Sequence, residues 1–284
     1  MDEIERVRDF NRYYTRRIGV LHLGGDRPFG EARLLFEIGA GADLRDLRAR
    51  LGLDSGYLSR LLRSLSTQGL VTVTPRPGDA RVRTAALTEA GRTALADLEE
   101  RSRASVAGLL APLTPPERDR LLRAQAEIHR LLRLAAITLT PVADSSPAAR
   151  ACLRAYASEL VTRFPEGYDA DGALLPPGTL HDGTFLLATE EETPVGCGLW
   201  QRFSDGAAEI RHLWVSPAAR GLGLARRLLT ALETDAAGHG VTTLRLGTHS
   251  SLVEAIALYR SAGYQEIPPY DDSPYNQLAF QKLL

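Results

Sequence analysis

The sequence predicts two domains, the first mainly helical and the second a mixed α/β fold. A chain of 284 residues is long for one compact domain and comfortable for two. Helical spacings dominate the first half, whereas successive strands appear in the second. The charge divides in the same way: the net charge is +5 up to Ile137 and −6 from Thr138 onward. A basic first half suits a polyanionic partner, although a genome that favours Arg codons would give the same excess.

The first half is expected to hold helices around one short hairpin. An apolar stripe at helical spacing marks the first helix, over residues 2–22, and contains Ile4, Val7, Phe10, Tyr14 and Ile18. The next helices are predicted to begin at capping residues or to end at glycines. These lie at 30–39, 42–52 and 55–68, followed by a hairpin around a Pro-Gly-Asp turn at 77–79 and by helices at 90–105 and 115–134.

A helix–turn–helix followed by a basic hairpin is the winged-helix arrangement, which binds DNA. Its second helix lies in the major groove and the hairpin tip reaches the minor groove. Guanidinium groups at these positions can pair with phosphates or enter a narrow minor groove. In this chain the second helix of the pair is the one expected at 55–68, and its candidate DNA contacts are Ser55, Tyr57, Ser59, Arg60 and Arg63. Those on the hairpin are Arg76, Arg81 and Arg83.

The segment GDARVRTAALTEAG, at 78–91, resembles the MarR family of bacterial regulators in its Asp-x-Arg and Leu-Thr-x-x-Gly motifs. The resemblance covers about residues 1–137. It implies that Asp79 braces the wing arginines, that Arg81 contacts a double-stranded DNA operator, and that the chain forms a homodimer. The dimer would be joined through the first helix and the two long helices. A winged helix kept only for dimerisation or protein contacts remains the alternative.

The two domains are expected to meet without a flexible linker. A β-branched strand begins near Thr138 and a Ser/Pro-rich turn follows it. We therefore predict a winged-helix domain at 1–137 and an α/β domain at 138–284. In the second domain, three successive strands are expected between 183 and 215, with turns near 190–194 and at 204–206.

A glycine-rich turn follows the third of these strands and leads into a helix, in SPAARGLGLARRLLTALE at 216–233. A strand, such a turn and a helix N-terminus together make a site for anions such as pyrophosphate. No Gly-Lys-Ser/Thr ending is present, which excludes a Walker loop. Arg226 stands where a dinucleotide fingerprint needs its third glycine, which excludes that motif. A turn that is merely rich in glycine remains the alternative.

The segment RGLGLA, at 220–225, resembles the Arg/Gln-x-x-Gly-x-Gly/Ala signature of the GNAT N-acetyltransferases. AEIRHLWVSPAARG and EAIALYRSAGYQE resemble that fold's central strand and a later helix, and the match covers about 138–284. The resemblance implies direct transfer of an acetyl group from acetyl-CoA to an amine in a ternary complex. Main-chain groups of Leu213 and Val215 would bind the pantetheine arm. The pyrophosphate would be held by Arg220, Gly221, Leu222, Gly223, Leu224 and Ala225.

The same resemblance supplies candidate catalytic residues. Tyr259 would protonate the departing thiolate, because a phenol stays protonated at neutral pH; a core aromatic is the alternative. Glu209 matches a position often used as the base, and alternation along a strand would place it on one face with Arg211 and Leu213. A structural ion pair is the alternative for Glu209. His212 would point to the opposite face, and His249 stands where relatives often have Asn.

The acceptor is expected to be a small amine or an amino-acid-like compound, with protein lysine still possible. Its pocket is expected between 156–168 and 263–280, with Tyr264, Tyr270 and Tyr275 among prolines and acids. The alternative function is a transcription factor whose inactive GNAT domain senses acetyl-CoA or a small ligand. A working enzyme whose winged helix serves only dimerisation is a third reading. No metal site is expected, and a charged N-terminus with only two cysteines predicts a cytoplasmic protein.

Overall fold

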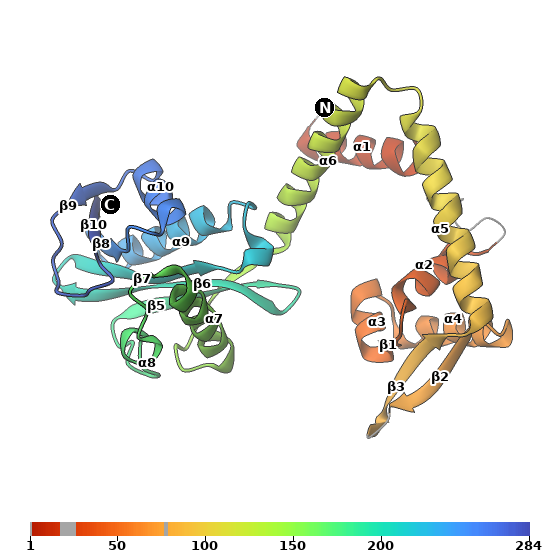
Figure 1. Ribbon diagram of the computed structural model, residues 1–284, viewed down its shortest axis with the longest axis horizontal. Helices are drawn as coiled ribbons and strands as arrows, with labels where there is room; N and C mark the ends of the chain where they lie inside the picture. Colours follow the sequence, from red (N-terminus) through yellow and green to blue (C-terminus); the bar gives the residue numbers. More distant parts are fainter. Residues whose placement is uncertain (1, 18–26, 77–78) are drawn as a thin grey trace. The chain divides into compact units, whose positions relative to one another are not determined.

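The computed structural model describes residues 2–17, 27–76 and 79–284. The chain divides into two compact units, Met1–Arg120 and Leu121–Leu284. The division falls inside α6 (Pro115–Ala136), so this helix contributes residues to both units. Figure 1 labels the helices and strands of each unit. Within the part of the chain that the structure describes, every helix is too short or too polar to cross a membrane.

The first unit is mainly helical, as predicted. Its other helices are α1 (Glu3–Arg17), α2 (Phe29–Ile38), α3 (Leu44–Leu51), α4 (Ser55–Thr67) and α5 (Glu89–Leu110). The apolar faces of α2, α3 and α4 meet in a core where Leu34, Leu47 and Leu65 are fully buried. In contrast, α1 buries none of its residues in this unit. The end of the predicted first helix, with Ile18, lies outside the described residues.

The predicted hairpin is present. Strands β2 (Val71–Arg76) and β3 (Asp79–Leu87) pair antiparallel, and β3 also pairs with β1 (Ala42–Asp43). Two residues are too few to show a period, so β1 was not predicted. Pro77 and Gly78 of the expected Pro-Gly-Asp turn lie outside the described residues.

The junction between the hairpin and α5 explains the Leu-Thr-x-x-Gly motif. The Thr88 hydroxyl accepts a hydrogen bond from the Gly91 N–H at 3.0 Å, which caps α5. The same hydroxyl donates to the Gly69 carbonyl at 2.6 Å. A Cβ atom at Gly91 would lie 2.0 Å from the Leu70 carbonyl oxygen, so only glycine fits this approach.

The second unit is a seven-stranded sheet with helices on both faces. The strand order is β4-β5-β6-β7-β8-β10-β9, and among the described pairs only β7 and β8 run parallel. The strands are β4 (Thr138–Val142), β5 (Gly183–Glu190), β6 (Thr193–Ser204), β7 (Ala207–Val215), β8 (Thr243–Thr248), β9 (Gln265–Ile267) and β10 (Leu278–Leu283). The three strands expected between 183 and 215 are therefore confirmed.

The sheet separates two hydrophobic cores, one on each of its faces. Helices α7 (Pro147–Arg163) and α8 (Ala170–Ala173) cover one face, and α9 (Leu224–Gly238) and α10 (Val253–Ser261) cover the other (Figure 1). Phe185 and Leu199 are buried on the α7 side, whereas Trp200 and Ile210 are buried on the α9 side. Side chains of neighbouring strand positions thus alternate between the two helix layers. Any break in that alternation changes which residues reach a given face.

Candidate active site

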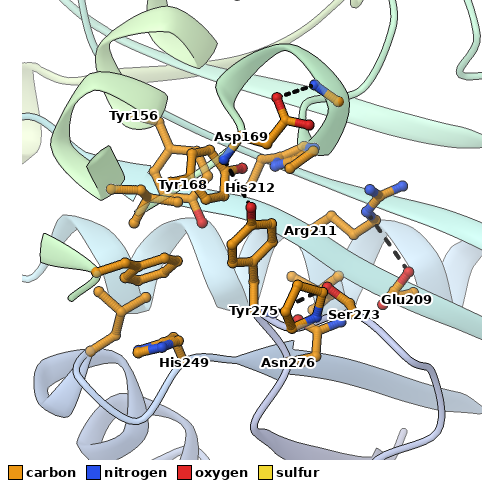
Figure 2. Close-up of a pocket in the computed structure, with 18 residues that line it drawn as sticks. Tyr156, Tyr168, Asp169, Glu209, Arg211, His212, His249, Ser273, Tyr275 and Asn276 are labelled. Carbon is orange, nitrogen blue, oxygen red and sulfur yellow. Dashed lines mark hydrogen bonds and ion pairs between the residues drawn. The ribbon is translucent and has the colours of Figure 1, made fainter. Parts of the chain in front are cut away.

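A cavity of about 480 Å³ opens where β7 parts from β8. The parallel ladder between these strands covers only the pairs from Ala207–Thr243 to Glu209–Arg245. Beyond Glu209, β7 continues to Val215 while β8 stays paired with β10. Figure 2 shows side chains from α7, the loop before α8, β7 and the C-terminal segment converging on this opening. The labelled lining residues are Tyr156, Tyr168, Asp169, Glu209, Arg211, His212, His249, Ser273, Tyr275 and Asn276.

A bulge in β7 corrects the predicted face assignment. Leu199 of β6 pairs with Arg211 and Cys197 pairs with Trp214, so β7 has one residue more than β6 between these pairs. His212 has a backbone φ of +54°, a value that residues other than glycine rarely adopt. As a result Arg211 and His212 both line the pocket, while Leu213 packs with the α9-side core. The predictions that Leu213 shares a face with Glu209 and that His212 points away from it were wrong.

The His212 imidazole is buried and acts as a hydrogen-bond acceptor. Its Nε2 accepts the Leu175 N–H at 3.2 Å, and the Tyr156 ring lies edge-on at 5.9 Å between centroids. Burial, and then the charge of Arg211, lowers the pKa of His212 to about 3. The ring is therefore neutral at physiological pH and fixes the start of the segment that follows α8.

Glu209 is a half-buried carboxylate of the pocket, with 23% of its side chain exposed. The Tyr270 hydroxyl donates to its Oε1 at 2.7 Å, and the Arg211 Nε lies 3.9 Å from its Oε2. Burial raises the pKa of Glu209 above its ordinary value, against the opposing effects of Tyr270 and Arg211. A carboxylate with a raised pKa is a stronger base than an exposed one. This environment suits a group that takes a proton.

Tyr259 is buried in α10, within the core on the α9 side. Its ring lies 5.9 Å from that of Phe280, and burial raises the pKa of its hydroxyl to about 12. Tyr259 itself is not among the residues that line the pocket. It does influence Tyr156, which lines the pocket: burial, and then the phenols of Tyr168 and Tyr259, raise the Tyr156 pKa.

His249 forms part of the pocket wall. Its ring stacks on Phe164 at 4.1 Å between centroids. The Ser251 N–H donates to its Nδ1 at 3.1 Å, and its Nε2 lies 3.4 Å from an oxygen of Glu166. With the Nδ1 lone pair already engaged, the neutral ring carries its proton on Nε2. In this arrangement His249 presents an N–H group and a ring face rather than a free basic nitrogen.

The glycine-rich loop connects the end of β7 to α9. A short 3-10 helix (Pro217–Ala219) is followed by Gly221 with a φ of +74° and by Gly223 with a φ of +90°, which begins α9 without a side-chain cap. Leu222 and Leu224 are buried beneath the loop. Because the first N–H groups of a helix lack partners within it, this anchored loop offers donors to an anion.

Arg220 ties the loop to α7 and to β7. Its Nε donates to the Val215 carbonyl at 3.1 Å, and its Nη2 pairs with Glu159. Glu159 also accepts a hydrogen bond from the Trp214 indole at 2.9 Å. The Arg220 charge is thus partly neutralised in the structure, and its side chain remains half-exposed beside the loop.

The last turns of α6 also contact the loop. Arg130 donates to the Gly221 carbonyl at 3.3 Å, and Arg133 donates to the Ala218 carbonyl at 3.2 Å. Arg133 is held by a two-point ion pair with Glu190, at 2.6 and 2.8 Å. In return, Arg227 of α9 donates to carbonyls at the end of α6. The backbone of the loop therefore bonds directly to α6.

In the first unit, α4 presents a polar face to solvent. Asp54 caps the helix by accepting the Tyr57 N–H at 2.9 Å, and the leucines of the opposite face are buried. The predicted contact residues Ser55, Tyr57, Ser59, Arg60 and Arg63 are all exposed. The guanidinium of Arg60 lies 5.6 Å from the Tyr57 ring centroid. This face is free to meet another surface.

The hairpin places its charged residues differently. Arg83 and Asp79 are exposed, and the side chain of Arg81 lies outside the described residues. Arg76 forms an ion pair with Asp43 at 2.6 Å, which links β2 to the start of α3. Arg76 is therefore a brace of the hairpin as well as an exposed cation.

Comparison with known proteins agrees with this architecture. Residues 149–264 match the acetyltransferase (GNAT) family, and residues 26–82 match the MarR family. The two matched segments lie in the predicted order, with the MarR match before the GNAT match. Over 95 residues it is 37% identical to a protein named IAA acetyltransferase from Azospirillum brasilense, covering 33% of this chain and 61% of that relative. The chain spans between 56% and 63% of the length of the curated relatives it matches.

Solved structures resemble each part of the chain. A GNAT-family acetyltransferase from Staphylococcus aureus Mu50 is 17% identical, with a TM-score of 0.45, and the match covers 52% of this chain and 99% of that one. Wild-type MarR from E. coli is 21% identical, with a TM-score of 0.39, covering 45% of this chain and 96% of that one. The predicted two-domain fold, winged helix followed by GNAT, is confirmed.

Several features of the GNAT pocket were not predicted. Tyr156, Phe164 and Tyr168 were expected only as part of a broad segment, and Asp169 was not singled out. Tyr275 lines the pocket and Tyr270 supports Glu209, but Tyr264 is buried in the α9-side core. The bulge at His212 has no sequence signal, because the alternation around it reads as an unbroken strand.

Proposed function

We propose that this chain is a transcriptional regulator that also transfers the acetyl group of acetyl-CoA to a small amine or amino-acid-like acceptor. The observation that carries the proposal is the free edge of β7. It runs from the Glu209 pocket to the glycine-rich loop at the start of α9, so one ligand can reach both. The match of residues 149–264 to the GNAT family supports the same reaction class.

The loop and strand fit a thioester attached to a pyrophosphate. Main-chain groups of Leu213 and Val215, on the unpaired edge of β7, would bond the amide-rich arm. The N–H groups from Gly221 to Ala225 would hold the pyrophosphate, since Gly221 and Gly223 let the main chain face it. Arg220 would add positive charge on releasing part of its pairing with Glu159. Acetyl-CoA supplies the activated acetyl group in this arrangement.

The acceptor amine must lose a proton before it attacks. Glu209 takes that proton, because its pKa is raised and its carboxylate faces the pocket. The amine nitrogen then bonds to the acetyl carbon while the bond from that carbon to sulfur breaks. Tyr259 returns a proton to the departing thiolate, as its hydroxyl stays protonated at neutral pH. His249 positions the acceptor through its ring face and Nε2–H.

The MarR-type region would bind a double-stranded DNA operator as a homodimer. The exposed face of α4 and the arginines of the hairpin supply the contacts, with Asp79 bracing the wing and Arg81 at its tip. Helix α1 leaves Ile4, Val7 and Tyr13 more than half exposed, which fits a dimer surface. We propose domain limits of 1–137 and 138–284, and a cytoplasmic location in which both buried cysteines stay reduced.

The test is thiol release from acetyl-CoA across a panel of small amines and amino acids. Wild-type protein should release thiol with one amine class. Tyr259→Phe should be slower by about a hundredfold or more, in the range of a lost general acid. Tyr264→Phe is the matched control: it removes the hydroxyl of a second buried tyrosine, 6.0 Å away between ring centroids, to which no catalytic role is assigned. Equal rates in wild type and Tyr259→Phe would contradict the role of Tyr259.

A second candidate is a sensor whose GNAT domain binds acetyl-CoA or a small ligand without turnover. The bonds from Arg130 and Arg133 to loop carbonyls favour it, since α6 belongs to both units and ligand binding at the loop would act on it. A ligand changes DNA affinity only if it binds the two dimer states unequally. Acetyl-CoA that binds without any turnover, and that shifts DNA affinity, would favour this candidate over the enzyme.

A further inference from the structure

We propose that the acceptor is an aromatic α-amino acid, which narrows the acceptor class and rests on the proposed acetyltransferase function. The geometry that points to it is a carboxylate and a guanidinium side by side on β7, facing a wall of aromatic rings across one cavity. Each of these parts matches one group of such a molecule.

The cationic part is Arg211. It is the only Lys or Arg among the residues that line the cavity, and its side chain is 36% exposed. Its one close partner in the described residues is Glu209, at 3.9 Å, which is longer than a hydrogen bond. Arg211 therefore keeps its planar set of donors for a ligand. A carboxylate is the group that such a fork binds best, through two parallel hydrogen bonds.

The spacing of the charged pair suits one carbon that bears both an amine and a carboxylate. Glu209 and Arg211 lie two residues apart on the same face of β7, about 6.6 Å along the strand. An α-amino acid can span them, with its amine at Glu209 and its carboxylate at Arg211. A diamine would place its second ammonium against Arg211, where like charges repel. A lysine within a protein would bring no free carboxylate to Arg211.

The aromatic part is a wall built from the segment that follows α7 and from two loops, one after β8 and one before β10. Phe164 stacks on His249 at 4.1 Å and on Tyr275 at 5.8 Å, and Tyr168 lies 4.8 Å from Tyr275. All four rings line the cavity. The Asp169 N–H donates to the Tyr275 hydroxyl at 2.8 Å, which fixes that ring (Figure 2). A preformed set of ring faces favours an aromatic side chain over a short aliphatic one.

The test is calorimetric titration of three compounds into the full-length protein in the presence of CoA. L-phenylalanine carries all the groups, phenethylamine lacks the carboxylate, and L-alanine lacks the ring. We expect phenylalanine to bind about tenfold to a hundredfold more tightly than phenethylamine, the range of a charge-assisted hydrogen bond. We expect alanine to bind at least about tenfold more weakly than phenylalanine, because ring contacts are lost.

The matched variants locate the carboxylate site. Arg211→Met should abolish the preference for phenylalanine over phenethylamine. Arg154→Met, which removes an exposed guanidinium from the surface of α7, should keep that preference. If Arg211→Met does not fold, the affinities of the three ligands for wild-type protein still test whether the acceptor needs both a carboxylate and an aromatic ring. No binding of phenylalanine, or affinity equal to that of phenethylamine or alanine, would overturn the proposal.

Failure here and failure of the proposed function give different results. Acetylation of phenethylamine at the same rate as phenylalanine would support the proposed acetyltransferase function. It would contradict the proposal that the acceptor is an aromatic amino acid. Binding of phenylalanine with the expected preference, but without thiol release, would support the ligand class and contradict the transferase.

Discussion

Burial shifts the pKa values of two residues of β7 in opposite directions. His212 is held neutral as an acceptor from the Leu175 N–H, with a pKa of about 3. Glu209, three positions earlier, has a raised pKa and a hydrogen bond from Tyr270. One residue therefore resists gaining a proton, and the other gains one more readily than usual. Both effects predict how the protein responds to pH.

The first prediction concerns acid stability. The unfolded chain protonates His212 near pH 6.5, whereas the folded chain does so near pH 3, so the free energy of unfolding falls as the pH drops through this interval. The loss from this residue should approach about 1.4 kcal/mol per pH unit. Urea unfolding at pH 7 and pH 5 should show a smaller loss for His212→Asn than for wild type. Equal losses would contradict the buried, neutral state of His212.

The second prediction concerns Glu209. Glu209→Gln should lower kcat/KM by a factor of about 10² to 10⁴, because the proton acceptor is lost. In wild type, kcat/KM should rise with pH through the raised pKa of Glu209, and this rise should be absent from the variant. The folded state holds that proton more tightly than the unfolded state, so ionisation costs stability above this pKa. Glu209→Gln should therefore unfold at a higher temperature at pH 7.

Glu100→Gln, on an exposed position of α5, is the control for this change. It should alter neither the pH profile nor the unfolding temperature. If Glu209→Gln retains wild-type activity, the base lies elsewhere, and a structural ion pair is the remaining role for Glu209.

At the scale of elements, the loop between β7 and α9 is where sequence and structure agree most closely. Gly221 and Gly223 both have positive φ, as a turn in RGLGLA requires. The hairpin was predictable for a similar reason, because β-branched residues and a turn are local signals. The bulge in β7 and the strand β1 were not predictable, since both depend on pairing with β6 and β3, which lie elsewhere in the chain. The aromatic wall likewise joins segments about a hundred residues apart.

The third prediction tests this loop. Gly223→Ala forces a side chain into a φ of +90°, so we expect weaker acetyl-CoA binding, by about tenfold, and a loss of roughly 1–2 kcal/mol in stability. Gly238→Ala, at the other end of α9, has space for its Cβ and should be neutral or slightly stabilising. Calorimetric titration with acetyl-CoA and thermal unfolding measure both effects. Unchanged binding by Gly223→Ala would contradict the phosphate-holding role of the loop.

The fourth prediction tests the hairpin. Replacing both Arg81 and Arg83 with Ala should abolish gel shifts of operator DNA selected from a random duplex library, because phosphate contacts at the wing are lost. Arg154→Ala, in the GNAT domain, should leave the shifts unchanged. Normal DNA binding by the double variant would favour contacts through α4 alone. Failure of wild type to select any duplex would favour a winged helix that serves only dimerisation.

At the scale of the whole molecule, α6 is the helix that contributes residues to both compact units. It begins in the first unit and ends against the loop proposed to hold acetyl-CoA. The sequence predicts a boundary between residues 137 and 138, whereas the two compact units divide between Arg120 and Leu121, inside α6. The sequence does not show that the helix bonds to the loop. Arginines on a long polar helix look alike whether they face solvent or a carbonyl. The hydrogen bonds from Arg130 and Arg133 to the Gly221 and Ala218 carbonyls show that these arginines hold the loop against α6.

The fifth prediction concerns the assembly. Helix α1 exposes Ile4 at 69% and Val7 at 59%, and it buries no residue within its own unit. We expect a dimer in light-scattering measurements of wild type, and a monomer when Val7 and Phe10 are both replaced by Glu. Loss of the dimer should weaken DNA binding and leave thiol release unchanged. A wild-type monomer at micromolar concentration would contradict the proposed dimer surface.

The most direct test of the central claim follows a labelled acetyl group from acetyl-CoA. Full-length protein is incubated with isotope-labelled acetyl-CoA and a set of amines that includes aromatic amino acids, and products and protein are analysed by mass spectrometry. We expect label on the amine nitrogen, dependence on Glu209 and Tyr259, and no labelled protein intermediate. Label that stays on CoA in the presence of every amine, or that accumulates on the protein, would contradict direct transfer.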